Sequence, residues 1–180
     1  MIMGTCKACV ISTSDLADNQ PGAVEGYESP FKTYGGRRAF HGAIATVTCF
    51  EDAGPIRAYL AEPGHGRVLV ADAGGSRRVA VLGDKMARLG LGNGWAGVIV
   101  NGAVRDCETL ATLDVGVLAL GSVPVRGGLH GQGERETDVT VAGIPFGAGK
   151  YVYVDADGIL LCRGPLRVDS TGDGAECVLR

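Results

Sequence analysis

The stretch Gly83–Asp106, GDKMARLGLGNGWAGVIVNGAVRD, decides the fold and also holds the residues best suited to chemistry. Residues 83–89 have the apolar spacing of a short helix, which the glycines at 90, 92 and 94 are expected to end. The run Trp95–Val100 is compact and apolar, as in a buried strand, and Gly102 is expected to break it. The stretch closes on an arginine–aspartate pair. It therefore predicts a helix followed by a buried strand, with charged groups at both outer ends.

Similar signals flank this stretch and extend it into a repeating α/β pattern. Arg67–Asp72 and Val115–Leu120 are apolar enough for buried strands, and Glu108–Leu113 suits a helix. Alternating strands and helices predict a parallel sheet with right-handed crossovers, whose ligands bind beyond the carboxyl ends of the strands. Asp84 and the pair Arg105–Asp106 both follow such strand ends. We expect them to lie at one edge of the sheet.

Local patterns predict the remaining elements, with a C-terminal hairpin turning at Asp157–Gly158. Gly121–Glu136 is a glycine-rich loop, long for a compact domain, and is predicted to be a functional lid or an interface loop. The other expected elements are a helix beginning in Ser12–Asp18, a loop over Asn19–Pro30, a strand over Ala39–Phe50, a helix over Ile56–Ala61, and strands over Asp138–Val141, Ile144–Phe146, Tyr151–Val154 and Ile159–Cys162.

The composition favours one soluble domain over residues 1–180, with residues 1–11 and 168–180 as tails. A hydrophobic content of 46% is ample for a core. The net charge of −3 and the scattered basic residues argue against direct nucleic-acid binding. No apolar run is long enough to span a membrane, and no secretory signal pattern is present. A cytoplasmic location is therefore expected.

Several short motifs have a plainer interpretation than a functional one. Cys6 and Cys9 form a CxxC without the second pair or histidine that a zinc site needs, so reduced thiols are favoured. Gly92–Gly97 matches G-x-G-x-x-G but follows a helix and enters a strand, the reverse of the dinucleotide fingerprint. Asp155–Gly158 lacks the closing glutamate of a calcium loop, so a turn is favoured. The isolated histidines are predicted to be structural or exposed: His41, His65 and His130.

What remains is Asp84 with Arg105 and Asp106, and residue chemistry alone leaves two interpretations open. Asp84 could simply be a first-turn acid favoured by the helix dipole. Arg105 and Asp106 could be an ordinary solvated ion pair. The alternative is a catalytic site at the carboxyl edge of the sheet.

An ordered set of motifs over about residues 14–166 resembles the family of the regulator of ribonuclease E activity A, which includes metal-dependent 4-hydroxy-4-methyl-2-oxoglutarate aldolases. The aldolases of that family carry an aspartate, twenty residues, then Arg-Asp, and Asp84, the span 85–104 and Arg105–Asp106 fit without a gap. The motifs are Gly35-Gly36-Arg37, Asp72–Gly75, Gly83-Asp84, Asn93–Gly97, Asn101–Asp106, Leu113–Gly116 and Tyr153–Gly158.

The resemblance implies a layered α/β sandwich of the swivelling β/β/α type, with a mixed parallel sheet. It also implies roles for the site. Arg105 would pair with substrate oxygens, Asp106 would ligate a divalent ion, Mg²⁺ or Mn²⁺, and Asp84 would hold one of its waters. Backbone N–H groups would hold the carboxylate of a pyruvate-like substrate at the helix N-terminus. These groups belong to Gly83, Asp84, Lys85 and Met86.

The implied reaction is class II retro-aldol cleavage of 4-hydroxy-4-methyl-2-oxoglutarate, in which the ion and Arg105 stabilise a pyruvate enolate. Oxaloacetate decarboxylation would pass through the same enolate. Family resemblance also implies a homotrimer or hexamer with the site near a subunit boundary. Two alternatives stay open: a protein inhibitor of ribonuclease E that acts through its surface, and an enzyme for another 2-oxo acid.

Overall fold

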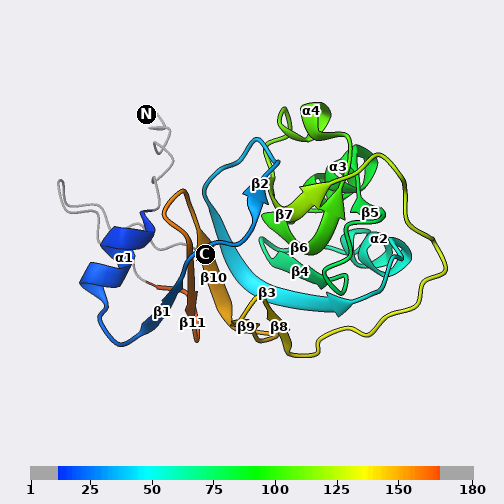
Figure 1. Ribbon diagram of the computed structural model, residues 1–180. Helices are drawn as coiled ribbons and strands as arrows, with labels where there is room; N and C mark the ends of the chain where they lie inside the picture. Colours follow the sequence, from blue (N-terminus) through cyan, green and yellow to red (C-terminus); the bar gives the residue numbers. More distant parts are fainter. Residues whose placement is uncertain (1–11, 167–180) are drawn as a thin grey trace, which may run out of the picture.

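The computed structural model describes residues 12–166, and a mixed sheet dominates the fold (Figure 1). Within the described residues, nine strands form one sheet, in the order β1-β11-β10-β3-β4-β6-β7-β2 with β5 beside β6. The central strands pair in parallel, and the sequence predicts this for three of them, β4, β6 and β7. These are β3 (Phe40–Thr48), β4 (Val68–Asp72), β5 (Ala80–Leu82), β6 (Gly97–Val104) and β7 (Gly116–Ser122).

The outer strands pair antiparallel. The predicted C-terminal hairpin is confirmed: β10 (Tyr151–Val154) and β11 (Ile159–Cys162) join around a turn in which Asp155 Oδ1 accepts the N–H of Asp157 at 2.9 Å. The turn at Asp155–Gly158 thus has the plain structural role expected of it. The other antiparallel strands are β1 (Val24–Tyr27), β2 (Lys32–Thr33) and the separate pair β8 (Val139–Val141) and β9 (Ile144–Phe146).

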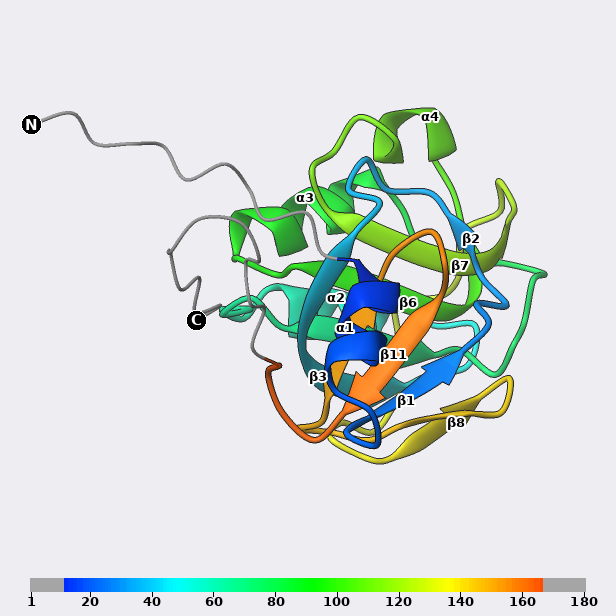
Figure 2. The same cartoon turned by 90° about the vertical axis from the view of Figure 1, so that its left-hand side faces the viewer.

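Four helices occur in the described residues, and each begins close to where the sequence predicts one. Ser12 caps α1 by accepting the N–H of Asp15, and α1 lies over β11 (Figure 2). The helix after Asp106 is shorter than expected and ends at Leu110 instead of Leu113. The helices are α1 (Thr13–Asn19), α2 (Gly54–Leu60), α3 (Asp84–Gly92) and α4 (Cys107–Leu110).

Alternate residues of the parallel strands face two different cores. In β4, Leu69 and Ala71 pack with α2 and α3, whereas Val68 and Val70 pack with β8, β9, β10 and β11. Two-sided burial is what makes these strands continuous apolar runs. The result is a helical layer, a parallel layer and an antiparallel layer, which confirms the predicted layered α/β sandwich with a mixed sheet.

The predicted loop over residues 19–30 is wrong in part, because it contains β1. This strand pairs with β11 in the register Val24↔Cys162 to Tyr27↔Ile159. Its sequence, VEGY, has partly buried ends and an exposed middle, so it carries no period-2 apolar signal. Pairing with a distant strand, rather than local preference, creates it.

The expected break at Gly102 is also wrong, because β6 continues to Val104. Gly102 instead permits a close approach: a Cβ at this position would lie 2.9 Å from the Cβ of Ala73. The register with β7 shifts between Val100 and Ala103, as at a β-bulge. β5 is not predicted by its sequence, because its three residues are too few for a periodic pattern.

Gly116 has a packing role that yields a stability prediction. The ring of Phe40, 2% exposed, lies so close that a Cβ on Gly116 would meet its Cγ at 2.4 Å. Because both partners are buried, the clash can be relieved only by shifting the core. Gly116→Ala is therefore expected to lower the free energy of unfolding by about 1–3 kcal/mol in urea titrations. Gly92→Ala, at a position with open space, is the control and should cause no such loss.

The histidines lie as the sequence predicts. His41 is structural as predicted: its ring stacks on Tyr151 and Tyr153. His65 and His130 are exposed. The Cys6–Cys9 motif and both predicted tails lie outside the described residues. Within the described part of the chain, no helix has the length and apolarity needed to cross a membrane.

Candidate functional site

The carboxyl ends of β4, β5 and β6 meet at one edge of the sheet, which the sequence predicted as the functional edge. Asp72 and Asn101 are register partners, and Asn101 Nδ2 donates to Asp72 Oδ1 at 2.7 Å. The N–H of Arg105 donates to the carbonyl of Leu82 at 3.0 Å, which places the end of β6 beside the start of α3. Asp84 and the pair Arg105–Asp106 therefore lie together, as expected from topology.

A pocket of about 470 Å³ opens at this edge. Its volume is in the range of small-molecule sites in proteins. Every predicted site residue lines it, and further walls come from β5, α2 and the loop after β7. The lining residues are Ala53, Arg57, Ala80, Val81, Leu82, Gly83, Asp84, Lys85, Met86, Leu89, Arg105, Asp106, Arg126 and Leu129.

The N-terminus of α3 forms one wall, with Gly83 as its extended N-cap residue. Two of the four N–H groups expected to face substrate already have acceptors: Asp84 donates to Asp106 Oδ2 at 3.3 Å, and Met86 donates to the carbonyl of Gly83 at 3.2 Å. Among residues 12–166, the N–H groups of Gly83 and Lys85 have no acceptor. The structure therefore leaves these two as the donors available to an anion at the helix N-terminus.

Asp106 sits in a conformation that few residue types adopt readily. Its backbone is left-handed, with φ 60° and ψ 40°, a region in which aspartate and asparagine are the favoured non-glycine residues. Its Oδ2 lies 3.5 Å from Nε of Arg105 and accepts the N–H of Asp84. A Cβ at position 83 would come within 2.6 Å of this oxygen, so the approach requires Gly83. The carboxylate is held at the pocket with its side chain 36% exposed.

The donor chemistry of this pocket fits Mg²⁺ or Mn²⁺ and does not fit a closed zinc site. Within residues 12–166, no group of three or more His, Cys, Asp or Glu side chains could enclose a metal ion. Structural zinc requires such a closed set, whereas Mg²⁺ usually keeps several waters and takes only one or two carboxylates. Asp106 offers one accessible carboxylate, and Asp84 borders the same pocket.

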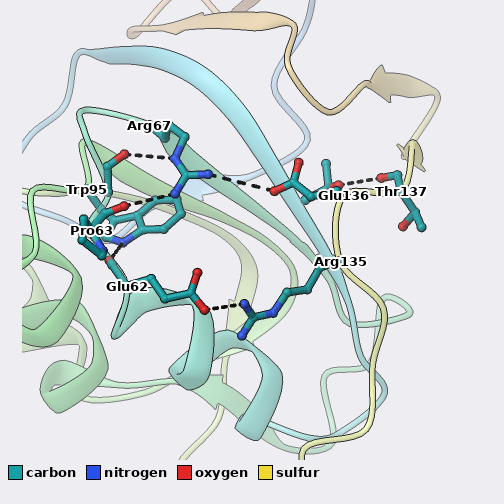
Figure 3. A network of polar contacts seen from close by, with 9 residues as sticks. Glu62, Pro63, Arg67, Trp95, Arg135, Glu136 and Thr137 are labelled. Carbon is teal, nitrogen blue, oxygen red and sulfur yellow. Dashed lines mark hydrogen bonds and ion pairs between the residues drawn. The ribbon is translucent and has the colours of Figure 1, made fainter.

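The Gly121–Glu136 loop forms a fixed wall of the pocket through Arg126 and Leu129. Its far end is fastened beside α2, where Arg135 Nη1 donates to Glu62 at 2.6 Å and Arg67 lies 4.0 Å from Glu136 (Figure 3). The predicted lid-or-interface loop is thus tied to the rest of the fold and brings side chains to the site.

Two cationic residues of the pocket, Arg57 and Arg126, are not predicted from the sequence. Arg57 lies on α2, and its helix carried no feature that suggested a site. Arg126 lies in the glycine-rich loop that the sequence marked as functional, and this was the one available signal. Both reach the pocket through tertiary structure, which spacing along the chain does not reveal.

Comparison with known proteins shows which family the chain belongs to. The family model described as aldolase/RraA, RraA-like, matches residues 13–161. The chain belongs to the aldolase/RraA family. A relative from Alkalilimnicola ehrlichii, provisionally named 4-hydroxy-4-methyl-2-oxoglutarate aldolase, is 49% identical over 156 residues, which are 87% of this chain and 97% of the relative. A relative from Hahella chejuensis with the same provisional name is 41% identical over 86% of this chain and 94% of its own length.

Two solved structures share the fold. The RNA-processing inhibitor RraA from Thermus thermophilis is 40% identical, with a TM-score of 0.84 over 91% of this chain and 99% of that one. A Geobacillus kaustophilus protein described as an S-adenosylmethionine:2-dimethylmenaquinone methyltransferase is 41% identical, with a TM-score of 0.81 over 87% and 97%. Together with the aldolase name of the relatives, these names describe three different activities. The choice among them for this aldolase/RraA member therefore depends on its site.

Proposed function

We propose that the pocket is the active site of a divalent-metal-dependent carbon–carbon lyase that cleaves 4-hydroxy-4-methyl-2-oxoglutarate to pyruvate. Oxaloacetate decarboxylation would use the same site. The observation that carries the proposal is the convergence of a helix N-terminus, Arg105 and Asp106 on one pocket. The provisional aldolase name of relatives up to 49% identical supports it.

Each residue has a role that follows from its position. The N–H groups of Gly83 and Lys85 would receive the substrate C1 carboxylate, where the helix dipole favours an anion. Nε of Arg105 lies 3.5 Å from Asp106 Oδ2, and its remaining N–H groups would pair with the C2 oxo oxygen. Asp106 would hold the divalent cation and Asp84 one of its waters. A cation held there would supply Lewis-acid polarisation of the C2 oxo group.

The proposed cleavage breaks the bond between C3 and C4. The C4 hydroxyl loses its proton and becomes a carbonyl, and the bonding electrons pass to C3 as the enolate of pyruvate. Arg105 would stabilise the negative charge that develops on the C2 oxygen, which grows as the bond breaks. Protonation at C3 then gives pyruvate, and the C4 fragment leaves as a second pyruvate. Loss of CO₂ from oxaloacetate produces the same enolate.

Pyruvate release tests this proposal directly. A lactate-dehydrogenase-coupled assay is run with 4-hydroxy-4-methyl-2-oxoglutarate and with oxaloacetate, in Mg²⁺ and then in excess EDTA. We expect release in Mg²⁺ that falls to the protein-free rate in EDTA and returns when Mn²⁺ is added. Release no faster than a metal-only control with both substrates would refute the lyase proposal.

A second candidate is inhibition of ribonuclease E, and the likeness to the Thermus thermophilis RNA-processing inhibitor favours it. Cleavage of a ribonuclease E substrate RNA is measured with increasing amounts of this protein. Inhibition that is equal for the native chain and for Asp106→Asn would place that activity on a surface separate from the pocket. No inhibition at any excess of protein would exclude this candidate.

A further inference from the structure

The pocket has an excess of positively charged residues, although the chain as a whole is acidic. Four cationic residues line the pocket, against two acidic ones, Asp84 and Asp106, whereas the full chain carries a net charge of −3. The cations are Arg57, Lys85, Arg105 and Arg126. A pocket with this excess favours a ligand that carries more than one negative charge.

The two carboxylates already have other partners. Asp106 lies 3.5 Å from Arg105, and Asp84 lies 3.8 Å from Arg88 on the next turn of α3. Within the described part of the chain, Arg57 and Arg126 form no ion pair within 4.0 Å. Both residues therefore line the pocket without a fixed counter-charge, and the fork of donors on an arginine suits a carboxylate.

The backbone that carries Arg126 is fixed. Ala80 of β5 donates to the carbonyl of Val125 at 2.7 Å and accepts the N–H of Gly127 at 2.9 Å, so Arg126 lies between two hydrogen bonds. Gly127 also allows a close approach, because a Cβ there would lie 2.7 Å from the carbonyl oxygen of Glu51. The backbone of Arg126 thus forms a fixed platform at the edge of β5.

One buried carboxylate links this platform to the helix that carries Arg57. Asp52, only 3% exposed, accepts the N–H of Gly54 at 2.8 Å, of His130 at 3.1 Å and of Gln132 at 3.0 Å. Burial opposes its ionisation, but the backbone donors outweigh that cost, and the pKa of Asp52 lies below its ordinary value. The charged carboxylate therefore fastens the first turn of α2 to the loop that carries Arg126.

We propose that Arg57 and Arg126 form a second anion subsite that binds the distal carboxylate of a dicarboxylic 2-oxo acid. The proposal rests on the proposed lyase function, in which the first carboxylate lies at the N-terminus of α3. Arg57 and Arg126 are then specificity-determining residues that select dianionic over monoanionic substrates. The backbone that carries Arg126 is held before binding, which limits the conformational entropy lost when a ligand is bound.

Calorimetric titration tests the subsite without turnover. In Mg²⁺, the native protein is titrated with 2-oxoglutarate, a dianion, and with 2-oxobutyrate, a monoanion with the same 2-oxo carboxylate. We expect 2-oxoglutarate to bind roughly 10- to 100-fold more tightly, the size of one charge-assisted hydrogen bond. Arg57→Gln and Arg126→Gln should each reduce this preference and leave the affinity for 2-oxobutyrate unchanged.

Arg38→Gln is the matched control, since it removes one exposed positive charge from the β2–β3 connection, beside the opposite edge of the sheet. It should keep the preference. The proposal would be overturned if the native protein bound the two acids equally well or bound neither. It would also be overturned if the two variants lost affinity equally for both acids. Failure of the lyase proposal is a separate result: the dianion preference is retained while pyruvate release is absent.

Discussion

Asp106→Asn is expected to abolish metal-dependent pyruvate release while leaving the fold intact. Lewis-acid stabilisation by a bound cation contributes several kcal/mol, so kcat should fall roughly 1,000-fold. Asparagine is the best replacement, because it tolerates the left-handed backbone at φ 60° and can still accept the N–H of Asp84. It has lost the negative charge that a divalent cation requires.

The measurement for Asp106→Asn is the coupled pyruvate assay over a Mg²⁺ titration, together with the melting temperature. Asp114→Asn is the matched control, since Asp114 pairs with Arg37 at the other end of the parallel strands. The control should keep the native rate. A native rate for Asp106→Asn with saturating Mg²⁺ would remove Asp106 from the site.

Arg105→Lys is expected to lower kcat roughly 100-fold with little change in KM. The change retains the positive charge but removes the planar fork, whose Nε lies 3.5 Å from Asp106 and whose other N–H groups are proposed to pair with the C2 oxygen. In other enzymes, loss of one hydrogen-bond donor to a developing oxyanion lowers kcat by about 100-fold or more. Because the charge on the C2 oxygen grows only as the bond breaks, the loss should appear in kcat.

Steady-state kinetics with 4-hydroxy-4-methyl-2-oxoglutarate separate the two parameters. Arg37→Lys is the control, because it makes the same substitution in an arginine that lies outside the pocket and forms two hydrogen bonds to Asp114. It should change neither kcat nor KM. A rise in KM with an unchanged kcat for Arg105→Lys would mean that Arg105 only binds substrate.

The sequence predicts the parallel layer and the pocket wall because both depend on local signals. β4, β6 and β7 are buried on two faces and are therefore continuous apolar runs. Asp84 and Arg105–Asp106 follow strand ends, and parallel pairing brings such ends to one edge. A single contiguous stretch thus contains the residues that the topology gathers.

The features that the sequence did not predict depend on distant partners. β1 forms because β11 offers it an edge, and β6 continues through Gly102, where the close approach of Ala73 leaves no space for a side chain. Arg57 and Arg126 meet at one pocket through Asp52, whose carboxylate joins the start of α2 to a loop nearly eighty positions later. No spacing rule along the chain relates them.

A crystal structure of the protein with Mn²⁺ and pyruvate tests the central claim most directly. We expect an anomalous peak about 2.1 Å from a carboxylate oxygen of Asp106, as in octahedral oxygen coordination of small divalent cations. The pyruvate carboxylate should lie at the N–H groups of Gly83 and Lys85, with its oxo oxygen at Arg105. Mn²⁺ or pyruvate bound elsewhere, with this pocket empty at saturating concentrations of both, would contradict the account.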